Sequence, residues 1–277
     1  MNPAQKALWY IESHLAEPLT LDDVAGVAGV SRFHLVRAFA AATGVSVMRY
    51  ARARRLTRAA QALAAGAPDI LSLALEADYG SHEAFTRAFR DHFGTTPEAV
   101  RAATRLDRLK LQEPIVMDST LLEHLKPPRF ETSRPLLVAG ISERCTYENG
   151  GAGIPNQWQQ LHQKVDFIPA RIGKVAYGVC CNGDDSGFDY IAGVGVANFS
   201  DLPREFARVR IPEQKYAVFT HSEHISAIRR TIITIWNHWL PISGMKAADA
   251  PSFERYDEKF DPATGNGGLE IWVPVRE

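Results

Sequence analysis

The chain has 277 residues, of which 45% are hydrophobic and 23% are charged, and its formal net charge is −1. This composition is that of an ordinary globular protein and excludes a disordered or fibrous chain. The length exceeds what one hydrophobic core usually serves, so we expect two domains. Residues 1–110 hold 14 Lys and Arg against 11 Asp and Glu, a net charge of +3, whereas residues 111–277 carry −4. This mild asymmetry permits DNA binding by the first part without establishing it.

The opening stretch, residues 1–17, places charged side chains among its apolar residues. That pattern fits neither the apolar core of a secretory signal nor a membrane span. We therefore expect a cytoplasmic protein with no membrane partner.

Residues 1–110 are expected to form an all-α domain, because Ala and Leu are abundant and apolar residues recur at spacings of three and four. A shift of fifty positions superposes Ser31 on Ser81, Phe39 on Phe89 and Gly44 on Gly94. Such self-similarity indicates a duplicated structural unit.

Each copy has the pattern of a helix-turn-helix. In the first, Thr20 can cap a helix over residues 21–28, Gly29 supplies the turn, and Ser31 caps a second helix ending near Gly44. In the second, Asp69 opens one helix and Ser81 caps another that runs to about His92. Residues 46–64 between the copies predict one long helix, about 28 Å at 1.5 Å per residue. Two reading helices at its ends could enter successive major-groove segments of one duplex.

The second helix of each copy has the residues that DNA reading needs, with small or polar groups near the N-terminus and cations for base edges or phosphates. We expect Leu35, Ala38 and Phe39 to pack inward. The candidate DNA-binding side chains on the outward faces are Arg32, Phe33, Val36, Arg37, Ser81, His82, Glu83, Thr86 and Arg87. Arg37 and Arg87 are equivalent across the repeat and are the strongest candidates. Any single arginine of this kind is more often just a solvated surface residue.

Beyond this part the pattern changes to strands, with residues 111–133 as a proline-containing linker in which 115–125 could hold a short helix. Residues 134–277 predict a duplicated β-α-β-β unit, giving a curved sheet with helices on one face. The concave surface left on the other side is a candidate pocket. The overall prediction is a multidomain α and α+β protein.

One acid stands out among the aromatic residues of this second part. Glu254 lies in a predicted strand and shares a face with Tyr256, because side chains alternate along a strand. A carboxylate beside an aromatic ring attracts an organic cation, although a strand-edge Glu facing water is an equally simple explanation. The three cysteines, at positions 145, 180 and 181, are expected to be reduced thiols, and we expect no metal and no cofactor.

The helical part resembles the DNA-binding domain of AraC/XylS-type regulators, especially the Rob-like branch. The residues that carry this resemblance are LTLDDVAGVAGVSRFHLVRAF, GVSVMRYARARRLTRAAQAL and FTRAFRDHFGTTPEAVR. It implies binding to double-stranded promoter DNA, with RNA polymerase as the downstream partner. Carried over by position, it places Phe33, Val36 and Arg37, and His82, Glu83 and Arg87, at reading positions. Phe33 departs from the Trp of Rob-like proteins, and Val36 and the His82–Glu83 pair depart from Gln, so we expect a different site sequence.

The second part resembles the gyrase-inhibitor-like effector-binding domain, of SHS2 type. The resemblance rests on WLPISG, FERY and EIWVPV. It implies a groove for a small, amphipathic or cationic effector in which Glu254 is the anchor. Its weaker aromatic companions are predicted to be Tyr256, Trp272, Tyr147, Tyr177 and Trp158.

These observations predict a transcription regulator that is not an enzyme. Two alternatives stay open. Some gyrase-inhibitor-like domains cleave small electrophiles with an acid and a tyrosine, although no Ser/His/Asp or Cys/His set with recognisable spacing occurs here. The second domain could also contact mainly another protein.

Overall fold

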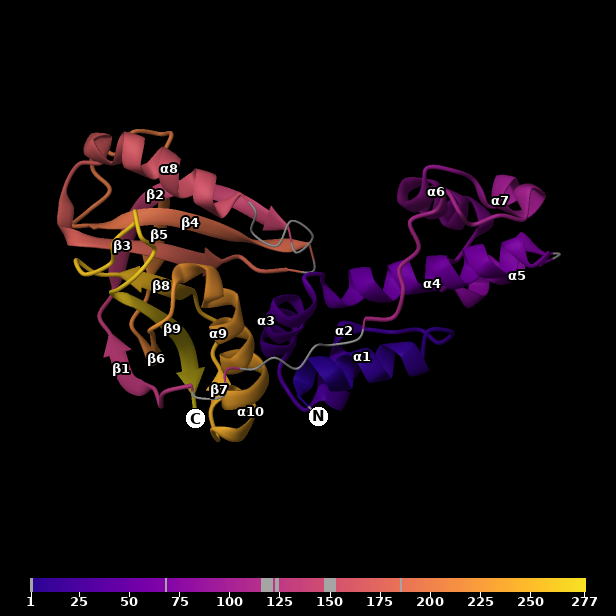
Figure 1. Ribbon diagram of the computed structural model, residues 1–277, viewed down its shortest axis with the longest axis horizontal. Coiled ribbons are helices and arrows are strands. Elements are labelled where there is room, and N and C mark those ends of the chain that lie inside the picture. The colour runs from indigo at the N-terminus through magenta and orange to yellow at the C-terminus, as the bar shows by residue number, and fades with distance from the viewer. Residues whose placement is uncertain (1, 68, 116–121, 123–124, 147–152, 185) are drawn as a thin grey trace.

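The computed structural model describes residues 2–67, 69–115, 122, 125–146, 153–184 and 186–277 (Figure 1). Its first part is helical, with α1 (Pro3–Ser13), α2 (Leu21–Ala28), α3 (Arg32–Thr43), α4 (Val47–Ala64), α5 (Ile70–Glu76), α6 (His82–Phe93) and α7 (Pro97–Ala103). The strands of the second part are β1 (Arg129–Ser133), β2 (Leu136–Thr146), β3 (Arg171–Cys181), β4 (Gly187–Val196), β5 (Ala207–Ile211), β6 (Gln214–His221), β7 (Lys246–Ala247), β8 (Ser252–Tyr256) and β9 (Leu269–Arg276). Its helical segments are α8 (Ile154–Lys164), η1 (Val165–Phe167), η2 (Ile225–Ala227), α9 (Ile228–Thr234), η3 (Ile235–Trp239) and α10 (Leu240–Ile242).

The duplicated helix-turn-helix is confirmed. Helices α3 and α6 each have 12 residues, and the hydroxyls of their caps, Ser31 and Ser81, accept hydrogen bonds from the amides of His34 and Ala84. Both helices end at a glycine in the left-handed region, where Gly44 has φ 77° and Gly94 has φ 71°. A glycine adopts this conformation at little steric cost. The same pair of residue types, a serine at the start and a glycine at the end, therefore fixes the length of both helices.

Helix α4 joins the two units. Its 18 residues span about 27 Å, with α1–α3 packed beside its first half and α5–α7 grouped at its far end (Figure 1). Two of its five arginines are buried structural ties rather than surface cations. Arg54 pairs with Glu12 at 2.8 Å, and Arg55 donates to the Leu15 carbonyl at 2.8 Å and pairs with Asp78 at 2.8 Å. Arg55 thereby joins the end of α1 to the turn of the second unit.

The second part is one curved, antiparallel sheet with the strand order β1-β6-β9-β8-β3-β4-β2-β5, and β7 pairs with β9. Residues 129–133, placed in the linker by the sequence prediction, instead form β1, in which Arg129 pairs with Val218 and Ser133 with Gln214. Strand β5, which the sequence pattern did not reveal, pairs with β2 at the other edge. The short helix expected over residues 115–125 lies largely outside the described residues.

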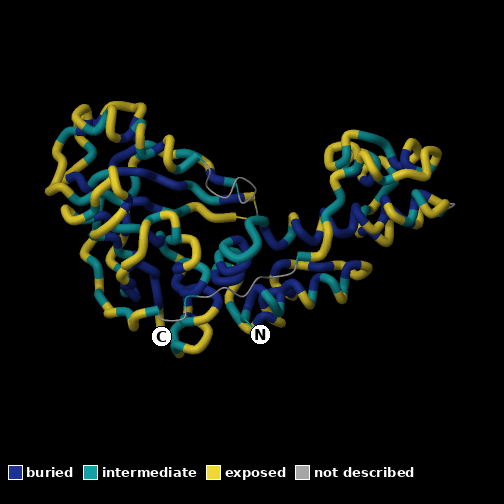
Figure 2. Tube along the Cα trace, viewed as in Figure 1, coloured by how far each residue is buried: buried dark blue, intermediate teal, exposed yellow. Residues whose placement is uncertain are grey.

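Helices cover one face of this sheet. Helix α8 packs on β2 and β4 through Leu161, and the α9–η3–α10 segment packs on β6 and β9 through Ile235 and Trp236. The opposite face has a core of its own, in which Tyr216 and Phe253 meet the side chains of neighbouring strands. In Figure 2 the sheet and the first half of α4 are largely buried, whereas the α6–α7 end shows many exposed positions. None of the helices in the described part of the chain combines the length and apolar character needed to cross a bilayer.

The segment η3 is a π-helical turn that lies against the helical part of the protein. The amide of Leu240 bonds the carbonyl of Ile235, five residues earlier. The next residue, Pro241, has no amide hydrogen to give to the carbonyl of Trp236. That carbonyl instead accepts a hydrogen bond from His34 Nε2 of α3 at 2.7 Å. The irregular turn therefore contacts the helical part of the protein directly.

Candidate DNA-reading face and ligand cavity

The predicted DNA-reading residues of α6 lie at an accessible surface. Glu83 and Arg87 are exposed, and His82 Nε2 lies 3.1 Å from the Glu98 carboxylate of α7. The half-buried side chains of this group are Ser81, His82 and Thr86. Hydrogen bonds at the helix N-terminus, from the Glu83 amide and the Ser81 hydroxyl, lower the pKa of the Glu83 carboxyl. Glu83 is therefore ionised where α6 would meet DNA, which restricts it to a partner that donates, such as a cytosine amine.

The predicted reading residues of α3 lie elsewhere than expected. Arg32 is exposed and pairs with Asp22 at 3.4 Å, but Phe33, Val36 and Arg37 are half-buried. Phe33 packs on the second domain and Arg37 bonds Ser252 of that domain, whereas Val36 packs on the core of the helical part. The prediction that these side chains face solvent is therefore wrong in this conformation. Their role in reading DNA stays a prediction.

The inward packing of α3 is also divided between the two domains. Leu35 and Phe39 belong to the core of the helical part, as expected. Ala38 instead belongs to the cluster formed by β6, β9 and the α9–η3–α10 segment. Ala38 therefore packs across the contact between the domains. The periodicity of one helix shows which faces are apolar but not which of two domains each face contacts.

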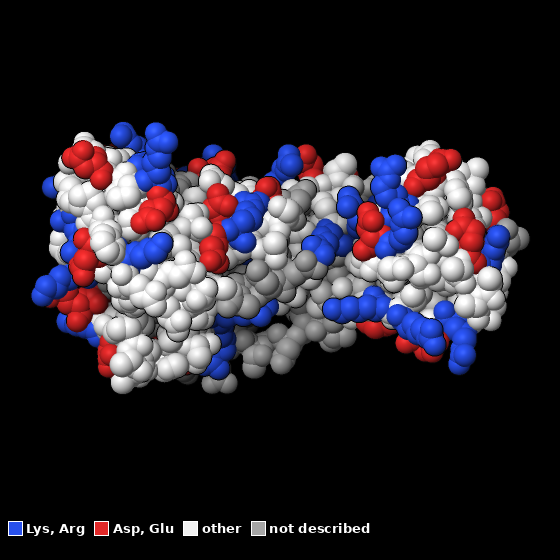
Figure 3. All heavy atoms as spheres, turned by 90° about the horizontal axis from the view of Figure 1, so that it is seen from above, with Lys and Arg blue, Asp and Glu red and all other residues white. Residues whose placement is uncertain are grey.

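Surface charge on the face seen in Figure 3 is mixed. Over the α4–α7 end, on the right of this view, Lys and Arg side chains form a row along one edge, with Asp and Glu beside them. The second domain carries both signs over its visible surface. This distribution agrees with the small positive balance of residues 1–110 and provides cations for phosphates on the helical part.

A cavity of about 750 Å³ lies between α3 and the helix-bearing face of the sheet. A volume of this size suits a small organic molecule. Its wall from α3 includes Phe33, Val36, Arg37, Ala40 and Ala41, and its wall from the second domain includes Cys180, Tyr190, Ile228, Ile232, Trp236, Ser252, Glu254, Ile271 and Val273. The pocket predicted on the concave surface left by the helices is therefore wrong, because that face of the sheet has a core of its own.

Glu254 is held at the wall of the cavity by two tyrosines. The hydroxyls of Tyr190 on β4 and Tyr256 on β8 donate to the same carboxylate oxygen, Oε2, at 2.7 and 2.8 Å. Gly178 faces Glu254 across the β3–β8 ladder, and a Cβ there would lie 2.1 Å from Tyr190 Oη. The absence of a side chain at position 178 therefore makes room for this hydrogen-bonded group.

Burial governs the charge of this group. Desolvation raises the pKa of Glu254, although the hydrogen bonds from Tyr190 and Tyr256 act in the opposite direction. Desolvation and the adjacent carboxylate raise the pKa of both tyrosines well above the usual value of 10.0. The tyrosines are therefore hydrogen-bond donors, and burial makes the charged form of Glu254 costly, a cost that a cation in the cavity would offset.

Of the predicted aromatic companions, the structure brings two to Glu254. Tyr256 bonds it directly, and Trp158 of α8 donates to Tyr190 Oη at 3.1 Å and packs edge-on against Tyr256 with ring centroids 4.9 Å apart. The prediction that Tyr177 and Trp272 lie beside Glu254 is wrong. Both contact Phe253, whose side chain points to the other face of β8. Tyr147 lies outside the described residues.

Sequence reasoning missed Tyr190 and Ser252 as residues of the cavity. Tyr190 was one aromatic among many in predicted strands, and its role depends on the pairing of β3, β4 and β8. One signal was available, since a glycine inside a strand, here Gly178, often marks a close approach by another group.

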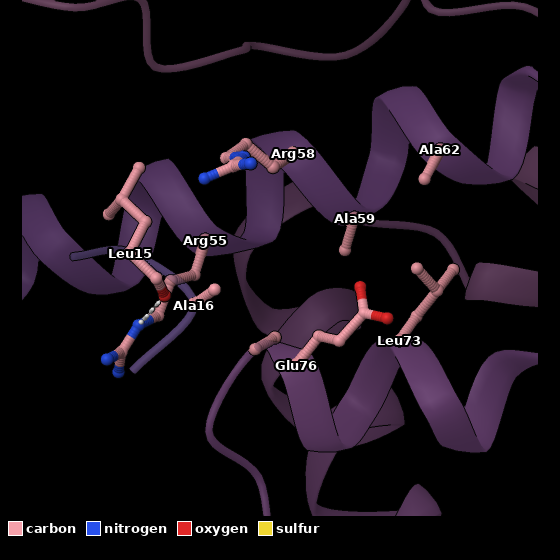
Figure 4. A pocket seen from close by; sticks show the side chains of 9 residues that line it. Leu15, Ala16, Arg55, Arg58, Ala59, Ala62, Leu73 and Glu76 are labelled. Atoms are coloured by element: carbon pink, nitrogen blue, oxygen red, sulfur yellow. Dashed lines mark hydrogen bonds between the residues drawn. The ribbon is translucent and has the colours of Figure 1, made fainter. Parts of the chain in front are cut away.

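A second, smaller cavity of about 200 Å³ lies between α4, α5 and the end of α1. Figure 4 shows Glu76 of α5 pointing toward Ala59 of α4, and Arg55 bonded to the carbonyl of Leu15. Its size is below that of most ligand sites, and Arg55 serves as a structural tie. Among the described residues, no group of three or more His, Cys, Asp or Glu side chains could hold a metal ion.

Comparison with known proteins accounts for this architecture. The family model described as a GyrI-like small molecule binding domain matches residues 126–276, more than half of the chain. The chain belongs to the GyrI-like family. A helix-turn-helix domain model matches residues 24–103, ahead of the GyrI-like domain.

Relatives extend over almost the whole length. The transcriptional regulator Rob of Salmonella typhimurium is 29% identical over 97% of this chain and 96% of its own. The right origin-binding protein of Escherichia coli K12 is 28% identical with the same coverage. A solved structure described as SAV2435 bound to tetraphenylphosphonium covers 55% of this chain and 94% of its own, with a TM-score of 0.47 and 19% identity.

The chain therefore joins an AraC-type helix-turn-helix region, which binds DNA, to a GyrI-like domain, which binds a small molecule. This is the domain composition of a ligand-responsive transcription regulator. The fold predicted from the sequence is confirmed at this level.

Proposed function

We propose that this regulator reads promoter DNA with α3 and α6 and responds to a lipophilic organic cation bound beside Glu254. The observation that carries the proposal is the carboxylate in the wall of a cavity of about 750 Å³. RNA polymerase is the proposed downstream partner, and the cytoplasm, where promoters are accessible, is the proposed location. The proposed domain limits are 1–110 and 134–277, with the first strand, β1, added to the second domain.

The chemistry of the cavity wall indicates that the ligand is a cation. Both tyrosine hydroxyls bond Glu254 Oε2, and within the part of the chain that the structure describes no hydrogen bond reaches the second carboxylate oxygen, which we assign to the ligand. Most of the wall is aliphatic or aromatic, which favours a ligand with a large apolar body. A carboxylate in such surroundings is stabilised by a delocalised positive charge, and aromatic faces attract the same charge.

Calorimetric titration with tetraphenylphosphonium tests the ligand proposal. This cation neither titrates nor donates hydrogen bonds, so its binding reports charge and apolar contact alone. We expect stoichiometric binding that weakens at least about ten-fold in Glu254→Gln, equivalent to about 1.4 kcal/mol. Glu258→Gln is the matched control, because Glu258 is exposed four residues further along the chain. Equal affinities of the two variants would contradict the proposal.

The DNA proposal is tested with a duplex selected by the full chain from a random library. Binding should weaken steeply between about 50 and 200 mM salt, because phosphate contacts release counterions. Arg87→Ala should cost about 1–3 kcal/mol on the selected duplex if its guanidinium reads a base. Binding that is insensitive to salt would argue against contact with the DNA backbone.

We also propose that the protein is not an enzyme. Tyr190 and Tyr256 both donate to one oxygen of Glu254, an arrangement that holds a charge and activates no nucleophile. Incubation with small activated esters should give no turnover. Sustained product release that is lost in Glu254→Gln would favour the hydrolase alternative.

A further inference from the structure

The second domain covers the face of α3 that is proposed to read DNA. Apart from the bonds of Arg37, three hydrogen bonds between described residues join α3 to the second domain, in addition to the packing of Ala38. His34 Nε2 bonds the Trp236 carbonyl at 2.7 Å, Asn237 Nδ2 donates to the Ala38 carbonyl at 3.0 Å, and Arg229 Nε donates to the Ala41 carbonyl at 3.2 Å. A DNA duplex cannot reach this face while the contact is closed, because the same side chains would have to touch both.

Arg37 completes the contact by extending into the ligand cavity. Its guanidinium donates to Ser252 Oγ at 2.6 Å and to the Cys180 carbonyl at 3.3 Å. Its central carbon lies 4.8 Å from the ring centroid of Phe33 and 5.6 Å from that of Trp236. Among the described residues no carboxylate pairs with it. An arginine of the reading helix therefore occupies the cavity as a cation among aromatic rings.

Its position relative to Glu254 follows from the register of the strands. Ser252 pairs with Cys180, and Glu254 pairs with Gly178, so the two pairs are successive on the same face of the β3–β8 ladder. Positions two residues apart along a strand are separated by about 6.8 Å. A second positive charge bound at Glu254 would thus lie close to the Arg37 guanidinium, and the two cations would repel each other.

We infer that Arg37 is an internal occupant of the effector cavity, and that an organic cation expels it and so releases α3 to bind DNA. The inference rests on the proposed function and adds its regulation. The closed form holds the reading helix against the second domain, and the effector and the DNA both favour the open form. Effector and DNA must then strengthen each other's binding by the same factor.

Repeat-equivalent arginines supply a matched pair of variants for the first test. Arg37→Ala removes the internal cation, whereas Arg87→Ala removes the corresponding residue of α6, which is exposed. If the closed form holds about 90% or more of the free protein, Arg37→Ala should bind tetraphenylphosphonium about ten-fold more tightly than the natural chain. Arg87→Ala should bind this cation with unchanged affinity. Equal cation affinity of Arg37→Ala and the natural chain would overturn the inference.

The second test measures DNA affinity of the full chain with and without saturating tetraphenylphosphonium. The cation should tighten binding to the selected duplex at least about five-fold. Ser252→Ala removes one partner of Arg37 without changing any residue of α3, so the DNA affinity of this variant without the cation should already rise about ten-fold. A cation that weakens DNA binding, as a ligand bridging the two domains would, overturns the inference.

The two proposals fail in different ways. The proposed function itself is overturned if the natural chain shows no Glu254-dependent binding of the cation, or no salt-dependent binding of DNA. With both activities present, cation and DNA affinities that are independent of each other overturn only the displacement of Arg37.

Discussion

Gly178 and Tyr190 fit together so closely that a methyl group at position 178 would lie 2.1 Å from the tyrosine hydroxyl. The same methyl group would lie 2.6 Å from Glu254 Oε2. The contact shows that β3 is shaped around the charged group on its neighbours, and it makes the site sensitive to the smallest possible substitution.

Gly178→Ala should disrupt the bond between Tyr190 and Glu254. Because the tyrosine ring is buried and cannot easily move, we expect a loss of about 1–3 kcal/mol in the free energy of unfolding. Tetraphenylphosphonium affinity should fall about ten-fold, equivalent to about 1.4 kcal/mol. Urea unfolding and calorimetric titration measure the two effects. Gly195→Ala is the control, because the nearest atom to its added Cβ is 3.6 Å away, an ordinary contact. Identical behaviour of the two variants would show that the group tolerates displacement.

Glu254→Gln should stabilise the protein in a manner that depends on pH. Burial raises the pKa of Glu254 above its ordinary value of 4.5. Folded protein therefore loses stability as the pH rises from that value through the raised pKa, and the loss is then constant. The difference in unfolding free energy between variant and natural chain should grow over this window and level off above it. Urea unfolding at several pH values tests this, and a difference that does not vary with pH would contradict it.

Arg55→Leu should weaken the link between the two helix-turn-helix units. The substitution leaves the carbonyl of buried Leu15 without its partner and removes the ion pair with the exposed Asp78 carboxylate. We expect a loss of about 2–4 kcal/mol in stability, since unpaired buried polar groups are costly. Arg52→Leu, at an exposed position three residues earlier, should change stability by less than about 0.5 kcal/mol. Similar unfolding curves for the two variants would show that Arg55 has no special role.

Cys180, which lines the cavity, and its neighbour Cys181 should be unreactive in the folded protein. Burial raises the pKa of Cys180 to about 12 and that of Cys181 to about 11. The thiolate is the nucleophile, so less than about one molecule in a thousand is reactive at pH 8. Iodoacetamide should modify these residues slowly in native protein and rapidly in denaturing urea, as mass spectrometry would show. Rapid native modification would mean that the cavity wall opens frequently.

Local sequence signals were sufficient for the helical part. Ser31 with Gly44, and Ser81 with Gly94, fix the start and end of α3 and α6 through their own backbone preferences. Such signals are read within a few residues, which is why the duplication was visible in the sequence. They do not show that α3 packs against a domain about two hundred positions away along the chain.

In the ligand cavity, too, the contacts within one strand could be predicted and those between strands could not. Alternation along one strand correctly put Glu254 and Tyr256 on one face, and Tyr256 bonds the carboxylate. The face of Trp272 depends on its pairing with Phe253 in another strand, so a prediction from one strand at a time misplaced it. Tyr190 was missed for the same reason, since only the order of the strands brings it to Glu254.

Pro241 has an effect well beyond its own helix. Lacking an amide hydrogen, it leaves the Trp236 carbonyl dependent on the imidazole of His34, so parting the two domains strands a buried acceptor. An amide hydrogen at position 241 is the donor that the π-helical register would direct to this carbonyl, five residues earlier. One backbone carbonyl, that of the cavity residue Trp236, thus helps to hold the two domains together, and a change at position 241 would alter the regulator's sensitivity without replacing a side chain of α3 or Glu254 itself.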